Sequence, residues 1–401
     1  MSEYIPIEIQ FEIIQRLPAK SAVRFRLVSK PWNSYIGSSE FIVAHHRRNI
    51  HQPQPHRLLA WFTDPLGEDA GRYVTVIDDD NFYQQDFTPK APRLAKKERE
   101  LPASRQYKIL TLSRVIDCSL GLLCLHGIYC RGRVTTKMAI IWNPLIRKSV
   151  RVVLPYSSNS KAVGFGVCPV TFDPTIVKIS HGDPSIDLPW EVKVFTLSSG
   201  TWKSLGLSNL PRKTVYLQSS NRRSQVVIDR FIYWDAYEWR IVAKDAIPEN
   251  INLIVSFDMT THEFELIDLP DSLSHPFHMK LSKIQESMVV VEYISDSVED
   301  LCTVWVMEDI VTKSFSRLYT IEVPMPSWHM VLGFRKSGEA IMKAHYAGEI
   351  VGTIEVYEPC SEHISKLGIY GDYGSFFVSS YMETLLLLDQ SDCHIYSDAH
   401  E

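Results

Sequence analysis

The sequence predicts an α+β chain in which three short N-terminal helices precede a large all-β domain made of repeated units. Apolar residues up to position 41 recur every three or four positions, as they do on helices. From Arg57 onward, short alternating or apolar runs are separated by Gly, Pro, Asp, Asn and Ser, which is typical of many short strands. We therefore expect a helical module over residues 1–48, a linker over 49–57 and a β domain over 58–396.

The first helix is expected to run from Pro6 to Leu17. A proline suits a first helical turn, because its missing N–H group is not needed there, and no breaker follows before Pro18. The helix carries two apolar stripes, one made of Ile5, Ile9, Ile13 and Leu17 and the other of Ile7, Phe11 and Ile14. At about 100° per residue, Ile7 and Ile9 lie ~200° apart around the axis. A single neighbouring surface therefore cannot bury both stripes.

Two further short helices are expected between residues 19 and 37. Their apolar positions are Val23, Phe25, Leu27 and Val28 in the second helix and Trp32, Tyr35 and Ile36 in the third. Three helices of this size bury too little surface to be stable alone, since domains of about 40 residues usually need outside support. An apolar groove on a partner protein would provide that support.

The segment IPIEIQFEIIQRLPAKSAVRFRLVSKPWNSYIGSSEFIVAHH resembles an F-box, the helical module that binds the Skp-type adaptor of cullin-based ubiquitin ligases. The resemblance rests on the opening Ile5-Pro6, where the family more often has Leu-Pro, on the turn Leu17-Pro18-Ala19-Lys20, and on Val28-Ser29-Lys30 with Trp32. It implies that aliphatic and aromatic side chains fill pockets of the adaptor. The residues expected at that contact are Ile5, Pro6, Ile9, Ile13, Leu17, Pro18, Val28 and Trp32. For each of them, the alternative is a place in the internal core of the three helices.

The β part contains a repeated unit: a strand, a turn rich in Thr, Ser, Lys or Asp, and a second strand that ends near Leu-Pro. Equivalent positions in five units are Trp142, Phe195, Phe257, Val306 and Tyr357, which are 53, 62, 49 and 51 residues apart. Repeats of ~40 to 50 residues with four strands each are typical of propeller blades. Weaker material at 58–83 and 376–396 raises the expected number of blades to six or seven. The runs RLLAWF and FFVSSYMETLLLLD are candidates for one blade shared by both ends of the domain, which would lock the ring.

Segments such as CSLGLLCL, IIWNPLIRKSVRVVLP and VKVFTLSSGTWKSL, within residues 110–330, are similar to the F-box-associated interaction domain of plant F-box proteins, which is propeller-like. One departure is Phe172-Asp173-Pro174-Thr175, where the family commonly has Asp-Tyr-Lys after the turn. Both resemblances together imply a substrate-recognition subunit of a Skp/cullin/F-box ubiquitin ligase. In that role the helices bind the adaptor, and the propeller holds a target protein near the ubiquitin donor. The resemblance names no target.

Two other functions remain open for the β domain. The central channel of a propeller could bind a small molecule through polar groups at strand ends, or the chain could serve as a scaffold that holds a partner without ubiquitination. An enzyme is not expected, because the patterns G-x-S-x-G, G-x-x-x-x-G-K-[ST], H-E-x-x-H and G-x-G-x-x-G are absent. No cofactor is expected.

Three polar or thiol clusters are not expected to bind metal. Asp78-Asp79-Asp80 is interpreted as an acidic turn between strands rather than a cation site. His45 and His46, with the polar residues up to position 51, are interpreted as a linker rather than a metal or nucleic-acid site, since adjacent histidines cannot share one helix face. Cys118, Cys124 and Cys130 are interpreted as thiols of the core.

The net charge of −5 conceals an asymmetry, because residues 251–401 contain 8 Lys+Arg and 24 Asp+Glu, whereas residues 1–250 contain 34 and 23. The pairs Arg212-Lys213 and Arg222-Arg223, with Tyr216 between them, have the composition of a nucleic-acid patch. The acidic C-terminal part would repel a polyanion, which disfavours nucleic acid as a partner. These five residues are instead candidate contacts to the target protein.

The sequence also indicates a location. The seven cysteines are an odd number without C-x-x-C spacing, no N-x-S/T sequon occurs, and no apolar run approaches ~18 residues. The opening MSEYIPIEIQ lacks the pattern of a secretory signal. We therefore expect a cytoplasmic or nuclear protein without membrane contact.

Overall fold

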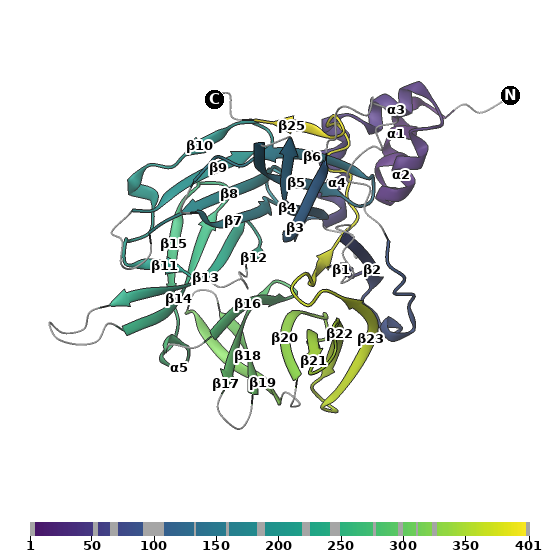
Figure 1. Cartoon of the computed structure of the whole chain (residues 1–401). Helices are drawn as coiled ribbons and strands as arrows, with labels where there is room; N and C mark the ends of the chain where they lie inside the picture. Colours follow the sequence, from purple (N-terminus) through teal and green to yellow (C-terminus); the bar gives the residue numbers. More distant parts are fainter. Residues whose placement is uncertain are drawn as a thin grey trace.

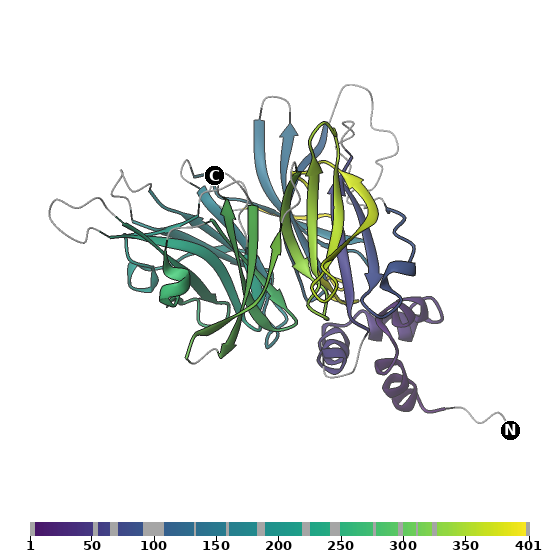
Figure 2. The ribbon, with the colours of Figure 1, turned by 90° about the horizontal axis from the view of Figure 1, so that it is seen from below.

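A computed structural model describes residues 5–50, 55–64, 71–90, 108–131, 134–157, 160–182, 189–218, 225–240, 249–275, 278–295, 300–309, 312–322 and 327–397. The N-terminal part forms four α-helices, which are α1 (Ile7–Gln15), α2 (Ala19–Phe25), α3 (Lys30–Ile36) and α4 (Ser39–Ile50). The helices lie at one end of the β-strands (Figures 1 and 2). Within the ranges above, no helix is long and apolar enough to cross a membrane.

Proline and serine residues mark the starts of the first three helices. Pro6 and Pro18 directly precede α1 and α2 in an extended conformation, and the Ser29 side chain accepts a backbone N–H at the start of α3 (3.3 Å). The helices pack on one another through Phe11, whose ring is stacked on Tyr35 with centroids 3.7 Å apart. One stripe of α1 therefore forms the core of the module, as the two-stripe pattern predicts.

The fourth helix corrects two expectations, because three helices are expected and residues 45–50 are interpreted as a polar linker. His45 and His46 lie in α4, and each is 1% exposed. The Nε2–H of His45 donates to the Leu17 carbonyl (2.8 Å), and the Thr384 hydroxyl lies 3.1 Å from His46 Nδ1. Composition alone suggests a polar linker here, because it does not show that both rings have buried partners elsewhere in the chain.

The rest of the described chain forms six β-sheets around a ring, a six-bladed propeller (Figure 1). Blade one consists of β2 (Gly71–Ile77), β1 (Arg57–Thr63) and β24 (Phe377–Tyr381). Blade two consists of β25 (His394–Tyr396), β6 (Lys148–Val153), β5 (Val134–Asn143), β4 (Leu122–Arg131) and β3 (Lys108–Ser119). Blade three consists of β10 (Trp202–Ser204), β9 (Glu191–Thr196), β8 (Pro174–Ser180) and β7 (Ser160–Val167).

Blade four consists of β15 (Phe264–Asp268), β14 (Glu249–Asp258) and β13 (Phe231–Arg240), with β12 (Gln225–Ile228) and β11 (Val215–Leu217) both paired to β13. Blade five consists of β19 (Ser314–Glu322), β18 (Asp300–Asp309), β17 (Ser287–Ser295) and β16 (His278–Ile284). Blade six consists of β23 (His363–Gly371), β22 (Gly352–Glu358), β21 (Ala340–Tyr346) and β20 (Ser327–Phe334). A short helix, α5 (Asp271–Ser274), connects blades four and five, and 3₁₀ turns lie at Phe82–Gln84 and Leu207–Asn209. Except for the parallel pair β6 and β25, neighbouring strands are antiparallel.

The repeated unit of the sequence corresponds to the blade. The five equivalent positions fall on β5, β9, β14, β18 and β22, each the third strand of its blade from the centre of the ring. Trp142 is fully buried and packs edge-on against Trp61 and Tyr73 of the preceding blade, with ring centroids 6.2 Å and 5.1 Å away. Trp142 therefore helps to hold blade two against blade one.

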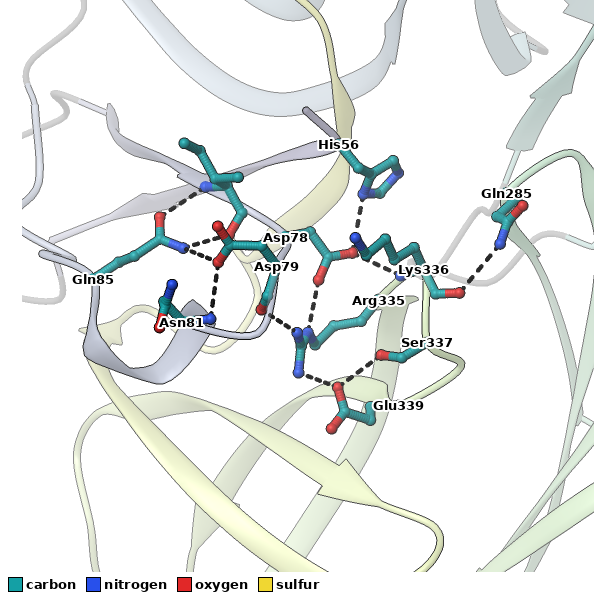
Figure 3. A network of polar contacts seen from close by, with 11 residues as sticks. His56, Asp78, Asp79, Asn81, Gln85, Gln285, Arg335, Lys336, Ser337 and Glu339 are labelled. Atoms are coloured by element: carbon teal, nitrogen blue, oxygen red, sulfur yellow. Dashed lines mark hydrogen bonds and ion pairs between the residues drawn. The ribbon is translucent and has the colours of Figure 1, made fainter. Parts of the chain in front are cut away.

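Blade one is built from both ends of the β domain. β1 and β2 come from its N-terminal end and β24 from its C-terminal end, with Leu59 opposite Ser379. The expectation that RLLAWF and the FFVSSY run share one blade is thus confirmed. Blade six adds a buried ion pair, in which Arg335 Nε donates to Asp78 Oδ1 (2.7 Å) (Figure 3). The ring is consequently closed by backbone pairing and by side chains.

A single apolar core joins the helices to the propeller. It contains Ile14, Ile36 and Phe41 from the helices together with the C-terminal run Leu385–Leu388 and residues of blades two and three. On the propeller side, Phe172 lies against the His46 ring (centroids 4.7 Å apart). The helices are therefore held in a fixed position relative to the propeller.

This joint is expected to weaken in acid because of His46. Burial lowers the pKa of His46 to about 4, so the folded state keeps the ring neutral, whereas an unfolded histidine takes up a proton below its ordinary pKa of about 6.5. The stability that the neutral His46 ring contributes is fully present above pH ~6.5. It is lost as the pH falls toward 4, which lowers the free energy of unfolding by about 3 kcal/mol. Urea unfolding between pH 7.5 and 4.5 measures this loss.

The variant His46→Phe keeps a ring beside Phe172 and is expected to show a flatter dependence of stability on pH. His45, whose pKa is also lowered by burial, is present in both proteins and cancels from the comparison. His363→Phe changes an exposed histidine and is expected to keep the wild-type slope. Equal slopes for wild type and His46→Phe would contradict this role.

Candidate interaction surfaces

Aliphatic side chains form an exposed patch on the helical module. Its members, here called the helical patch, are Ile5, Ile9, Ile13, Leu27 and Val28. Between 47% and 90% of each residue is exposed. Ile9 and Ile13 belong to the outward stripe of α1, and Leu27 and Val28 lie in the turn after α2. Apolar groups grouped on a surface in this way are typical of a site that another protein covers.

The other predicted adaptor contacts fall into two groups. Pro6 and Pro18 are exposed beside the helical patch. Leu17 and Trp32 are half-buried and pack against the apolar core, and Trp32 Nε1–H also donates to Gln10 (3.0 Å). The structure thus places six of the eight predicted residues at the surface and gives Leu17 and Trp32 contacts inside the module as well.

Leu27 is the member of the helical patch that the sequence reasoning does not single out. It is 90% exposed, although its spacing suggests an apolar position of the second helix. α2 ends at Phe25, so Leu27 lies outside the helix and its side chain is not turned toward the core. Two adjacent aliphatic residues between Arg26 and Ser29 are the signal that could have identified it.

The candidate target contacts on the propeller are only partly brought together. Arg212 makes an ion pair with Glu238 (3.2 Å), and Tyr216 of β11 is half-buried and stacks on Tyr237 with centroids 5.7 Å apart. Lys213 is exposed next to them. The positions 222 and 223, where Arg222 and Arg223 are predicted contacts, lie outside the described residues. Arg212 and Tyr216 therefore have partners within the chain already.

A cavity of about 970 Å³ occupies the centre of the ring. Residues of all six inner strands, β24, β3, β7, β12, β16 and β20, line it, and Ile50 of α4 borders it at the helical end. Its carboxylic acids are Asp117, Asp229 and Glu286, and its basic residues are Arg57, Arg114, Lys280, Lys283, Lys336 and Lys343, with His56. The cavity is therefore a second candidate site, distinct from the helical patch.

Asp117 is the buried acid of this cavity. Burial raises the pKa of Asp117 to about 6, although hydrogen bonds from Gln225 and from the Cys118 N–H oppose the shift. Gln225 Nε2 donates to Asp117 Oδ2 (2.7 Å), and Gln225 Oε1 accepts the Phe165 N–H (3.0 Å). Gln225 thereby connects three neighbouring blades, which is a structural use for the carboxyl group.

The remaining singled-out residues are structural. Burial raises the pKa of the Cys118 and Cys124 thiols, which makes them unreactive core residues as expected; the Cys130 side chain lies outside the described part. Asp79 and Asp80 lie in a turn after β2, whereas Asp78, the first residue of the predicted acidic turn, is fully buried. Asp78 is buried there because Arg335 supplies a counter-charge (Figure 3).

Comparisons with known proteins agree with this architecture. Residues 84–389 match the model of the F-box associated beta propeller domain, and residues 3–43 match that of the F-box domain. In Arabidopsis thaliana, F-box protein At1g30790 is 25% identical over 87% of this chain and 82% of its own length. F-box protein CPR1 is 25% identical over 80% and 73% of the two chains, and F-box protein At4g19940 is 23% identical over 92% and 86%.

The match to the propeller model covers most of the chain, and the structure has both parts in the expected order. This chain is an F-box protein that belongs to the F-box-associated β-propeller family. The sequence resemblance to plant F-box proteins with this domain is thus confirmed.

Proposed function

We propose that this protein is the substrate-recognition subunit of a Skp/cullin/F-box ubiquitin ligase. The observation that carries the proposal is the helical patch, which leaves about half of each of Ile5, Ile9 and Ile13 exposed on the F-box. The opposite stripe of α1 is used in the core shared with the propeller. An adaptor groove that covers the patch would bury these side chains, and each fully buried aliphatic residue contributes about 1.5–3 kcal/mol.

The proposed contribution of the chain is positional rather than catalytic. A target held on the propeller is presented at a fixed place relative to the adaptor, because the helices and the propeller share one core. Holding two reactants together raises their effective concentration without a catalytic residue in the chain that holds them. A cytoplasmic or nuclear location, and a target protein whose identity is open, are part of the proposal.

The test is the affinity of the purified chain for a Skp-type adaptor, measured by calorimetry. Ile9→Asp with Ile13→Asp is expected to weaken binding at least hundredfold, since each change would bury an unpaired carboxylate in an apolar groove. Both residues are about half exposed in the free chain, so its own unfolding temperature is expected to change little. That temperature is measured alongside the affinity.

The matched control is Ile350→Asp, because Ile350 is 87% exposed on blade six, away from the helical patch. It is expected to bind the adaptor as wild type does. Absence of adaptor binding by folded wild type, or equal losses in both variants, would overturn the proposal. A scaffold without ligase activity would bind the adaptor but fail to support ubiquitin transfer in a reconstituted reaction.

A further inference from the structure

The acidic half of the chain places its bases around the central cavity. Residues 251–401 contain 24 Asp+Glu and only 8 Lys+Arg. Four of these eight bases, Lys280, Lys283, Lys336 and Lys343, line the cavity, whereas Glu286 is the single acid of that region among the lining residues described. The charge at the centre of the ring is therefore opposite in sign to the net charge of the blades that supply it.

Lys280 and Lys343 both line the cavity, and the charge of Lys343 acts on Lys280. Lys280 extends from β16 toward β20, where its Nζ donates to the Val331 carbonyl. Lys343 of β21 donates to the Tyr373 carbonyl (3.1 Å), and its Nζ lies 4.2 Å from the centroid of the Tyr373 ring. A lysine that donates to a carbonyl keeps its positive charge. Both lysines can therefore connect blades and attract an anion in the cavity that they line.

Burial and the neighbouring charges together disfavour the charged form of Lys280. Lys343 of β21, Asp235 of β13 and Cys302 of β18 are the titratable groups that act on it. Burial and then the charge of Lys343 lower the pKa of Lys280 to about 7, against the attraction of Asp235. Burial raises the pKa of Cys302 to about 12, so this thiol is neutral and adds no counter-charge. A negative group placed between the two lysines would relieve their repulsion.

The other two lysines of the cavity are less suited to this role. Lys283 donates to the Val227 carbonyl (2.9 Å) and is paired with Glu286 (3.4 Å). Lys336 is exposed at the end of the cavity near the Asp78 network (Figure 3). The volume of about 970 Å³ lies within the ~300–1,000 Å³ of small-molecule sites. Because the cavity is lined by six Lys and Arg residues against three acids, its field favours anionic ligands.

We propose that the central cavity binds a small molecule carrying at least two negative charges, of the phosphate or carboxylate class, between Lys280 and Lys343. This site does not depend on adaptor binding, so the two can be tested separately. The bound anion would tie β16 of blade five to β21 of blade six and to the segment before β24, where the ring closes. Binding is therefore expected to raise the unfolding temperature of the propeller.

The first probe is pyrophosphate, titrated into the full chain by calorimetry. Saturable binding is expected, and Lys280→Met and Lys343→Met, measured separately, are each expected to weaken it at least tenfold. Lys313→Met and Lys366→Met remove exposed or half-exposed bases of the same acidic half that do not line the cavity, and are expected to bind as wild type. If Lys280 and Lys343 only connected blades, the two cavity variants would be less stable, but their folded molecules would bind pyrophosphate as tightly as wild type.

The second measurement is made on the wild type and does not depend on whether a variant folds. Sulfate keeps its double negative charge between pH 6 and pH 8, whereas Lys280 gains its proton over this range. The affinity of sulfate for the chain is expected to rise about tenfold from pH 8 to pH 6, because the chain binds sulfate when Lys280 is protonated. No saturable binding of pyrophosphate, equal binding by the cavity and control variants, or a sulfate affinity independent of pH would overturn the proposal.

Discussion

A chain that lacks residues 377–401 is expected to lose the folded β domain as a whole. This truncation removes β24, which pairs with β1 and places Ser379 opposite Leu59. It also removes the carbonyls of Thr384 and Leu386, which accept hydrogen bonds from the Asn143 side chain at 3.0 Å and 2.8 Å. β1 would then be an unpaired edge, and a buried amide would lose both acceptors.

The size of the effect follows from the run Leu385–Leu388. All four leucines are at most 5% exposed, between the helices and the propeller. Burial of one leucine is worth about 1.5–3 kcal/mol, so the four together contribute roughly 6–12 kcal/mol. That range is comparable to the ~5–15 kcal/mol by which whole domains are stable. No other single segment is needed to account for the collapse.

Circular dichroism and urea unfolding measure the outcome. The control is a chain ending at Ser397, which retains β24, the leucine run and β25 and is expected to unfold like the full chain. A truncated chain, residues 1–376, that stays monomeric and unfolds in one cooperative transition would show that the ring does not need its last strand.

Replacing Arg335 by Met is expected to cost about 3–5 kcal/mol of unfolding free energy, because it leaves a buried carboxylate without its cation. Asp78 is fully buried and accepts from Arg335 Nε (2.7 Å) and from the Lys336 N–H (2.6 Å) (Figure 3). Burial alone would raise the pKa of Asp78, but hydrogen bonds from His56, the Lys336 N–H and Arg335 outweigh it and lower the pKa to about 2. The charged form of Asp78 is thus built into the fold.

Two further variants separate this ion pair from general loss of a side chain. Arg72→Met removes the partner of Asp64 at the surface of blade one (3.0 Å) and is expected to cost at most about 1 kcal/mol. Adding Asp78→Asn to Arg335→Met removes the stranded charge and is expected to recover part of the loss. Urea unfolding at pH 7 measures the unfolding free energy of wild type and of the three variants. Equal costs for Arg335→Met and Arg72→Met would contradict the role assigned to the Arg335–Asp78 pair.

Local periodicity was sufficient to predict the features that repeat along the chain. The spacing of Ile9 and Phe11 on α1 indicates two faces, and the structure exposes one and packs the other. The period that relates Trp142 to Phe195 indicates the blade, because four of the five equivalent positions are buried aromatic residues. These features depend on neighbours within about 50 residues, so a linear sequence contains the information.

Features that depend on distant partners could not be predicted in this way. His46 meets Thr384, Asp78 meets Arg335, and Lys280 approaches Lys343 only after the ring has formed. The sequence shows the polar residues but not which of them becomes buried or paired. The unusual turn at Phe172 has the same kind of explanation, because its left-handed backbone (φ 58°) places the ring against His46 of α4.

Blade one also determines the order of events during synthesis. Its first two strands, β1 and β2, leave the ribosome about 300 residues before β24, their C-terminal partner. Contacts so far apart in sequence form late and slowly. The F-box therefore emerges before the propeller but packs on Leu385–Leu388 only after the propeller strands have been made. A C-terminally clipped chain would carry the F-box helices without the rigid propeller, so the proposed recruitment of a target would depend on closure of the ring.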